Sequence, residues 1–216
     1  MARPRSAKGR ARLANDRLTE IYPGTVRELC ELDFGDPFEL LTATILSAQT
    51  TDVRVNMVTP ELFNRYPTPD DLANADPEEL EGIIRTTGFF RSKARSLIGM
   101  ATALVERYDG AVPRAMADLV TVPGVGRKTA NVVRSVALDE PGLPVDTHVL
   151  RLSHRLKLTE ATDPVQAELD LNRFIPPAQR GLFSLRMILH GRRVCFARRP
   201  NCAACVLNDF CPSAQL

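Results

Sequence analysis

The sequence predicts an all-α fold built from many short helices. Helix-start signals recur along the chain, each an N-cap residue followed by proline and, two residues later, a carboxylate or amide. They begin at Asp36, Thr68, Asp76 and Asp163. Sustained alternation of apolar and polar residues is missing, and no Asn-Gly pair joins two β-rich runs. Apolar residues recur instead at helical spacing, as Ala14, Leu18 and Ile21 do.

Apolar patterns place the remaining helices. Residues 40–48 are apolar too densely for one stripe, which predicts a central helix buried nearly all round. Thr59-Pro60-Glu61 gives a shorter helix-start signal. One helix is expected to close at Val122, before a glycine-rich turn, and another to continue after it. Further helices are expected over 147–157, 164–173 and 178–191.

Composition limits the class of protein. The chain has 216 residues, 44% hydrophobic and 25% charged, which is typical of a globular protein of one or two domains. It contains no apolar stretch of the roughly 18 residues that a membrane span needs. Residues 1–17 are basic without an apolar segment, which argues against a secretory signal. The cysteines are therefore expected to stay reduced, so metal binding or catalysis is favoured over disulfides.

Charge is unevenly distributed although the net charge is only +2. Basic residues crowd the first segment, at Arg3, Arg5, Lys8, Arg10, Arg12 and Arg17, and the last, at Arg192, Arg193, Arg198 and Arg199. Acidic residues gather between 70 and 81. Local basic patches favour nucleic-acid binding more than the total charge does. A disordered tail and an ordinary solvated surface remain the alternative for the N-terminal run.

The glycine-rich turn lies in the stretch 122–133. Pro123, Gly124 and Gly126 interrupt an apolar helical pattern, and Lys128 falls in the first turn of the next helix. Such a turn points backbone N–H groups outward and suits a phosphate. The positive end of the helix dipole should make Lys128 easier to deprotonate, and a neutral lysine is a nucleophile. The alternative is a solvated lysine in a connector.

Lysine is rare in this chain, which carries positive charge almost wholly as arginine. The lysines are Lys8, Lys93, Lys128 and Lys157. Arginine cannot lose its proton in a protein, whereas lysine can, so a lysine beside Arg127 suggests that its amine is needed.

Asp146 follows about twenty residues later, in the sequence Val-Asp-Thr-His. It is a good N-cap for the helix over 147–157, and a structural cap is one interpretation of it. A carboxylate near an amine nucleophile can also take protons and stabilise a developing cation. His148 is expected to be a hydrogen-bonded packing residue rather than a ligand.

Four cysteines close the chain in a C-x6-C-x2-C-x5-C pattern. They are Cys195, Cys202, Cys205 and Cys211. Four thiols so close together in a reduced protein predict a four-cysteine metal site. Their spacing alone leaves both zinc and an iron–sulfur cluster open. The arginines around this loop would offset thiolate charge and could face phosphates. Cys30 stands apart and is interpreted as an ordinary buried cysteine.

The glycine-rich turn with Lys128, the Val-Asp-Thr-His sequence and the four-cysteine pattern occur in this order along the chain. Together they resemble the endonuclease III family of the helix–hairpin–helix DNA glycosylase superfamily. The stretches 46–52 and 88–94 extend the resemblance to nearly the whole chain after the N-terminal segment. It implies two helical lobes with a DNA-binding cleft between them. A six-helix barrel would span 30–140, with the helix–hairpin–helix over about 115–138. Residues 1–29 and 141–216 would form the cluster lobe, with residues 1–10 a flexible basic arm. The four cysteines of 195–211 would hold a 4Fe–4S cluster.

The resemblance also implies a mechanism. A damaged base is flipped out of the duplex, and Lys128 attacks the sugar and displaces the base with the help of Asp146. The resulting Schiff base then leads to β-elimination on the 3′ side. Three sets of residues would contact DNA. Gly124, Val125 and Gly126 would hold a phosphate, Gln49 and Phe89 would fill the gap left by the flipped nucleotide, and Arg198 and Arg199 would face phosphates. Phe89 departs from the family, in which leucine is common at that position.

The expected function is therefore that of a bifunctional DNA glycosylase and abasic-site lyase acting on oxidised pyrimidines such as thymine glycol. We expect a monomer that binds damaged double-stranded DNA in the cytoplasm, at the bacterial nucleoid. Three alternatives remain. One is a paralogue that cuts abasic sites but excises bases poorly. Another is adenine–mismatch excision, which Lys128 and the chain's ending soon after Cys211 disfavour. The third is a non-enzymatic DNA-binding or redox-sensing iron–sulfur module.

Overall fold

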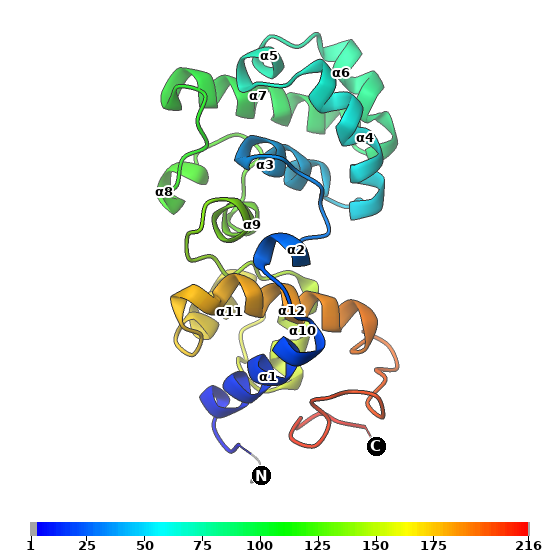
Figure 1. Cartoon of the computed structure of the whole chain (residues 1–216), viewed down its shortest axis with the longest axis vertical. Coiled ribbons are helices and arrows are strands. Elements are labelled where there is room, and N and C mark those ends of the chain that lie inside the picture. The colour runs from blue at the N-terminus through cyan, green and yellow to red at the C-terminus, as the bar shows by residue number, and fades with distance from the viewer. Residues whose placement is uncertain (1–3, 216) are drawn as a thin grey trace. The chain divides into compact units, whose positions relative to one another are not determined.

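The computed structural model describes residues 4–215, and every regular element within them is a helix (Figure 1). The all-α prediction is therefore confirmed. The chain divides into two compact units, one of Cys30–Glu140 and one that joins Met1–Leu29 to Pro141–Leu216. Among the described helices, none is both long and apolar enough to cross a membrane.

The 30–140 unit is organised around a buried central helix. Its helices are α3 (Pro37–Leu46), α4 (Asp52–Arg65), α5 (Pro69–Ala73), α6 (Pro77–Ile84), η1 (Arg85–Thr87), α7 (Phe90–Tyr108), α8 (Met116–Leu119) and α9 (Arg127–Ala137). In α3, every residue from Leu40 to Leu46 is buried, as the dense apolar pattern predicts. This helix packs against α4, α7 and α9, and α5 and α6 cover α7 (Figure 1).

Helix starts in both units follow the sequence closely. The side chains of Asp36, Thr68, Asp76 and Asp163 each accept a hydrogen bond from the backbone three residues on, and a proline follows each cap. Thr59-Pro60-Glu61 is the exception, because Pro60 lies inside α4, which begins after Thr51. Predicting a helix start there is wrong. Thr51 already caps α4 by accepting from Arg54 N, and buried Val58, Thr59 and Leu62 hold the helix together across the proline.

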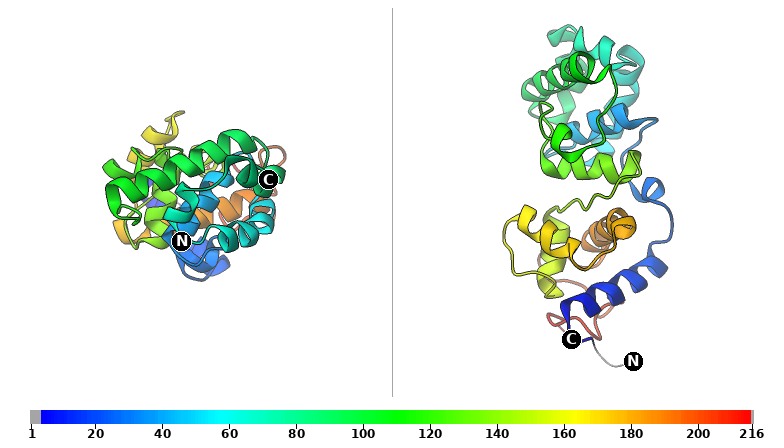
Figure 2. Two further views of the ribbon diagram at one scale, coloured as in Figure 1. Left: turned by 90° about the horizontal axis from the view of Figure 1, so that it is seen from above. Right: turned by 90° about the vertical axis from the view of Figure 1, so that its left-hand side faces the viewer.

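The second unit packs around α12. Its helices are α1 (Ala7–Ile21), α2 (Val26–Leu29), α10 (Thr147–Arg155), α11 (Pro164–Asn172), η2 (Pro177–Gln179) and α12 (Arg180–Arg193). Within this unit α12 contacts α1, α2 and α10. Fully buried Phe183 on α12 belongs to a core that also contains Leu18, Val149 and Leu171. Figure 1 and the right-hand view of Figure 2 both place the C-terminal loop (red) beside α1 (dark blue).

The flexible arm expected over residues 1–10 is wrong from Ala7 onward. Ser6 caps α1 by accepting from Gly9 N at 3.1 Å. Arg10 donates from Nε to the Leu156 carbonyl at 2.6 Å and from Nη2 to the Lys157 carbonyl at 2.7 Å. These bonds fix the first turn of α1 to the end of α10, so Arg10 serves the fold rather than a mobile tail. Residues 1–3, including Arg3, lie outside the described residues.

Candidate DNA-repair site and iron–sulfur loop

The turn between α8 and α9 has buried valines on its inner side and exposed glycines on its outer side. Val122 and Val125 are buried, whereas Gly124 and Gly126 are exposed. Gly124 has φ +76°, and a Cβ there would lie 2.9 Å from the Ser96 Cβ, so only glycine fits. No side chain caps α9 at Gly126. An uncapped helix N-terminus is the arrangement that receives an anion.

Lys128 lies in the first turn of α9 and is exposed. The same helix buries Ala130, Val133 and Val136 in its unit's core. This amphipathic packing fixes the helix, so the lysine side chain faces solvent from a rigid support. The structure therefore places Lys128 where the sequence predicts it, at the exposed start of the helix after the turn.

Asp146 is the N-cap of α10. Its Oδ1 accepts from His148 N and from Val149 N, both at 2.8 Å. The structural role is thus confirmed, and both cap bonds use the same carboxylate oxygen. His148 is half-buried, and its Nδ1 lies 3.0 Å from Arg151 Nη2. Burial lowers the pKa of His148, in keeping with a packing residue.

The four cysteine thiols line one recess. Cys195, Cys202, Cys205 and Cys211 are all free and half-buried, and the residues that line the recess with them include Arg155 and Asn208. Turns of the loop itself set this arrangement. Cys195 N donates to the His190 carbonyl at 2.8 Å, Cys205 N to the Cys202 carbonyl at 3.2 Å, and Cys211 N to the Leu207 carbonyl at 2.9 Å.

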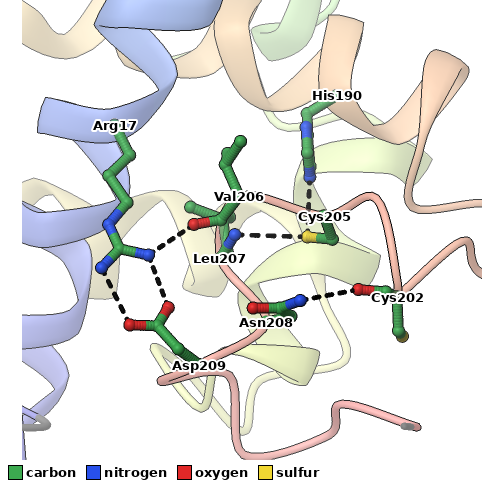
Figure 3. Close-up of polar contacts among 8 residues, drawn as sticks. All are labelled: Arg17, His190, Cys202, Cys205, Val206, Leu207, Asn208 and Asp209. Atoms are coloured by element: carbon green, nitrogen blue, oxygen red, sulfur yellow. Dashed lines mark hydrogen bonds and ion pairs between the residues drawn. The ribbon is translucent and has the colours of Figure 1, made fainter.

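Neighbouring side chains hold the loop and its sulfurs (Figure 3). His190 Nε2 lies 3.2 Å from Cys205 Sγ, and Leu207 N donates to the same sulfur at 3.4 Å. From α1, Arg17 donates to both Asp209 carboxylate oxygens and to the Val206 carbonyl. Arg155 Nη1 also donates to Cys195 Sγ at 3.0 Å. Sequence reasoning missed Arg17 and Arg155 in these roles.

The donor set fits an iron–sulfur cluster. Burial raises the pKa of Cys205 to about 11 and that of Cys211 in the same direction. A bound metal would favour the thiolate forms that ligate it. In residues 4–215, no three His, Cys, Asp or Glu side chains converge as the ligands of one ion do. Four cysteine sulfurs around one recess are the donor set that an iron–sulfur cluster takes.

The remaining predicted residues are found on the surface or at the edge of the core. Arg198 and Arg199 are exposed on the loop between Cys195 and Cys202. Cys30 is half-buried, and burial raises the pKa of its thiol, as expected of an unreactive cysteine.

Gln49 and Phe89 share an unusual backbone. Both are exposed, Phe89 at 67%, and both have left-handed φ values, 54° and 48°. The Phe89 side chain therefore lies outside the core. A third residue of the same unit, Lys93, was missed as a functional candidate, although its rarity as a lysine was the available signal.

Comparison with known proteins agrees with this organisation. The family model described as HhH-GPD superfamily base excision DNA repair protein matches residues 42–177, and the iron–sulfur binding domain of endonuclease III matches 195–211. Endonuclease III of Synechocystis is 53% identical over 92% of this chain and 90% of its own length. Endonuclease III of Escherichia coli K12 is 39% identical over 90% of this chain and 92% of its own. A solved non-covalent endonuclease III–DNA complex superposes with a TM-score of 0.89 at 42% identity and covers 96% of both chains.

The helical fold, the glycine turn and the cysteine loop thus define a base excision DNA repair protein of the helix–hairpin–helix class, with an iron–sulfur cluster. Within that class, the chain belongs to the endonuclease III family.

Proposed function

We propose that this chain removes oxidised pyrimidines such as thymine glycol from double-stranded DNA and then cuts the strand 3′ to the abasic site. It is a DNA glycosylase and abasic-site lyase of base excision repair. The observation that carries the proposal is the exposed Lys128 in the first turn of uncapped α9. A trapped covalent endonuclease III–DNA intermediate, 42% identical over 96% of this chain, supports covalent chemistry.

The backbone of the turn would place the DNA. Gly124, Val125 and Gly126 would present N–H groups to one phosphate, which fixes the position of the strand without reading its sequence. Gln49 and Phe89 would enter the gap that the flipped nucleotide leaves. Arg198 and Arg199 would neutralise phosphates from the cysteine loop.

Lys128 would then act as the nucleophile. Its neutral amine forms a bond from Nζ to the anomeric carbon, and the bond to the base breaks, with the electron pair leaving on the base. Asp146 accepts and returns protons and stabilises the cationic sugar. Ring opening gives a Schiff base that acidifies the neighbouring carbon. Removal of a proton from this carbon expels the 3′ phosphate by breaking the C3′–O bond. Hydrolysis of the Schiff base by water then frees Lys128.

The four cysteines would hold a 4Fe–4S cluster, which cross-links the loop that carries Arg198 and Arg199. The reaction itself uses the chain's own side chains. We further propose that the protein acts as a monomer in the bacterial cytoplasm, at the nucleoid, since its relatives in Synechocystis and Escherichia coli are bacterial.

Borohydride trapping tests the proposal on duplexes bearing thymine glycol, an abasic site or an undamaged base. Wild type should be trapped on both damaged duplexes and should cut them. Lys128→Ala should be trapped on neither, whereas Lys157→Ala, which removes another exposed lysine, should behave as wild type. Wild type that is not trapped and releases no base would identify a non-enzymatic module. Action on the abasic duplex alone would identify the lyase paralogue, and equal trapping of Lys128→Ala would remove Lys128 as nucleophile.

A further inference from the structure

Lys93, on α7, is a buried cation with all its donors used. It is 5% exposed, and its ammonium donates to Leu46 O at 2.7 Å, Thr50 Oγ1 at 2.8 Å and Thr87 O at 2.8 Å. Burying a charge is costly unless its hydrogen bonds are replaced, and an ammonium has three donors to satisfy. Burial lowers the pKa of Lys93. A hydrophobic side chain would cost less at this depth, so the ammonium indicates a specific task.

The three acceptors come from two different segments. Leu46 is the last residue of α3 and Thr87 the last of η1, so their carbonyls lie at helix C-termini, where the dipole favours a cation. Thr50 joins the segments directly, because its hydroxyl also donates to the Thr87 carbonyl. Lys93 therefore ties the segment after α3 to the end of η1.

These segments lead into the two exposed left-handed residues. Gln49 lies between Leu46 and Thr50, and Phe89 follows Thr87 by two residues. A left-handed backbone is unfavourable for any residue with a Cβ and persists only where its surroundings enforce it. The Lys93 bonds lie on both sides of Gln49 and immediately before Gly88 and Phe89. The bonds therefore restrain the two segments that carry Gln49 and Phe89.

We infer that Lys93 is a positioning residue that locks the loops of Gln49 and Phe89 together, so that both side chains enter the duplex as one wedge. What the loops do to DNA rests on the proposed function. The lock itself is a property of the free protein, and the two can be tested separately.

Tryptophan fluorescence tests the lock without DNA. The chain contains no tryptophan, so Phe89→Trp introduces a single reporter at the wedge. Adding Lys93→Met, which keeps the length of the side chain and removes its donors, should lower the fluorescence anisotropy of that tryptophan. Adding Lys8→Met, the same change at an exposed lysine, should leave it unchanged. An anisotropy that Lys93→Met does not lower would overturn the inference.

Cleavage of two DNA substrates tests the consequence. One carries thymine glycol in a fully paired duplex, and the other carries it in a bubble of unpaired bases, where no wedge is needed. Lys93→Met should cut the paired substrate at least about tenfold more slowly, because a small misplacement costs rate steeply. The bubble should be cut at the wild-type rate. Equal slowing on both substrates would indicate general damage to the fold and overturn the positioning role.

Two further outcomes keep the tests decisive. If wild type cuts neither substrate, the proposed function fails, and the anisotropy result still decides the role of Lys93. If Lys93→Met does not fold, Thr50→Val takes its place, because it keeps the lysine and deletes only the bridging hydroxyl. Thr50→Val should shift anisotropy and the paired-to-bubble ratio in the same direction by a smaller amount. Wild-type behaviour of Thr50→Val in that case would overturn the inference.

Discussion

Asp146 is expected to carry two roles that substitution can separate, helix capping and proton transfer. Asn keeps an oxygen that can accept from His148 N and Val149 N, whereas Ala removes it. Asn ranks with Asp as an N-cap, and replacing such a cap by Ala costs about 0.5–2 kcal/mol. In a chain of this size each kcal/mol shifts the melting temperature by about 2–4 °C. Asp146→Ala should therefore melt roughly 1–8 °C lower, and Asp146→Asn close to wild type.

Activity should follow a different order. Both variants lose the carboxylate, and positioned proton transfer contributes about 10²–10⁴ in rate. Asp146→Asn and Asp146→Ala should both therefore lose base excision by about a hundredfold or more, measured as single-turnover release of thymine glycol. Thermal melting followed by circular dichroism measures the melting temperatures of the same preparations.

Asp163 offers a matched control in the same unit. It caps α11 by accepting from Gln166 N at 2.9 Å. Asp163→Ala should lower the melting temperature as Asp146→Ala does and leave excision unchanged. Wild-type excision by Asp146→Asn would reduce Asp146 to a cap, and an unshifted melting temperature for Asp146→Ala would refute the capping argument.

Three other outcomes are expected. Gly124→Ala should lower the free energy of unfolding by about 1–2 kcal/mol, because it forces a Cβ into a left-handed backbone. Gly82→Ala, in open space on α6, should raise it by about 0.5–1 kcal/mol. Urea unfolding that ranks the two variants alike would contradict this. Cys202→Ser should lower iron content and visible absorbance, while Cys30→Ser should retain both, and full iron in Cys202→Ser would remove that ligand. Arg198→Ala should weaken DNA binding and reduce the slope of log affinity against log salt concentration by about 1. Arg12→Ala, on α1, should leave that slope unchanged. An unchanged slope for Arg198→Ala would place Arg198 away from phosphates.

Much of the local structure was predictable because its causes are local. The caps at Asp36, Thr68 and Asp163 depend on residues three positions apart, and the turn at Gly124 depends on glycine itself. The dense apolar run of α3 likewise predicted its burial. In each case the residues that decide the conformation are neighbours in sequence.

What escaped prediction depends on distant partners. Lys93 reaches Leu46, 47 residues away, through a main-chain carbonyl, and carbonyls carry no signature in the sequence. The first turn of α1 is fixed by Arg10 bonding to carbonyls 146 and 147 residues away, so residues 7–10 looked like a free basic arm.

The contact between Arg17 and Asp209 bears on the order in which the two units can fold. These residues are 192 positions apart, so α1 cannot make this contact until the loop that carries Asp209 has been synthesised. The 30–140 unit is continuous in sequence and can fold while the ribosome is still working. The unit around α12 closes only after Cys211 has emerged. A cluster held by all four cysteines can therefore form only after Cys211 has been synthesised. Until the core around α12 forms, the apolar face of α1, with Ala11, Ala14 and Leu18, lacks the partners that bury it in the folded unit.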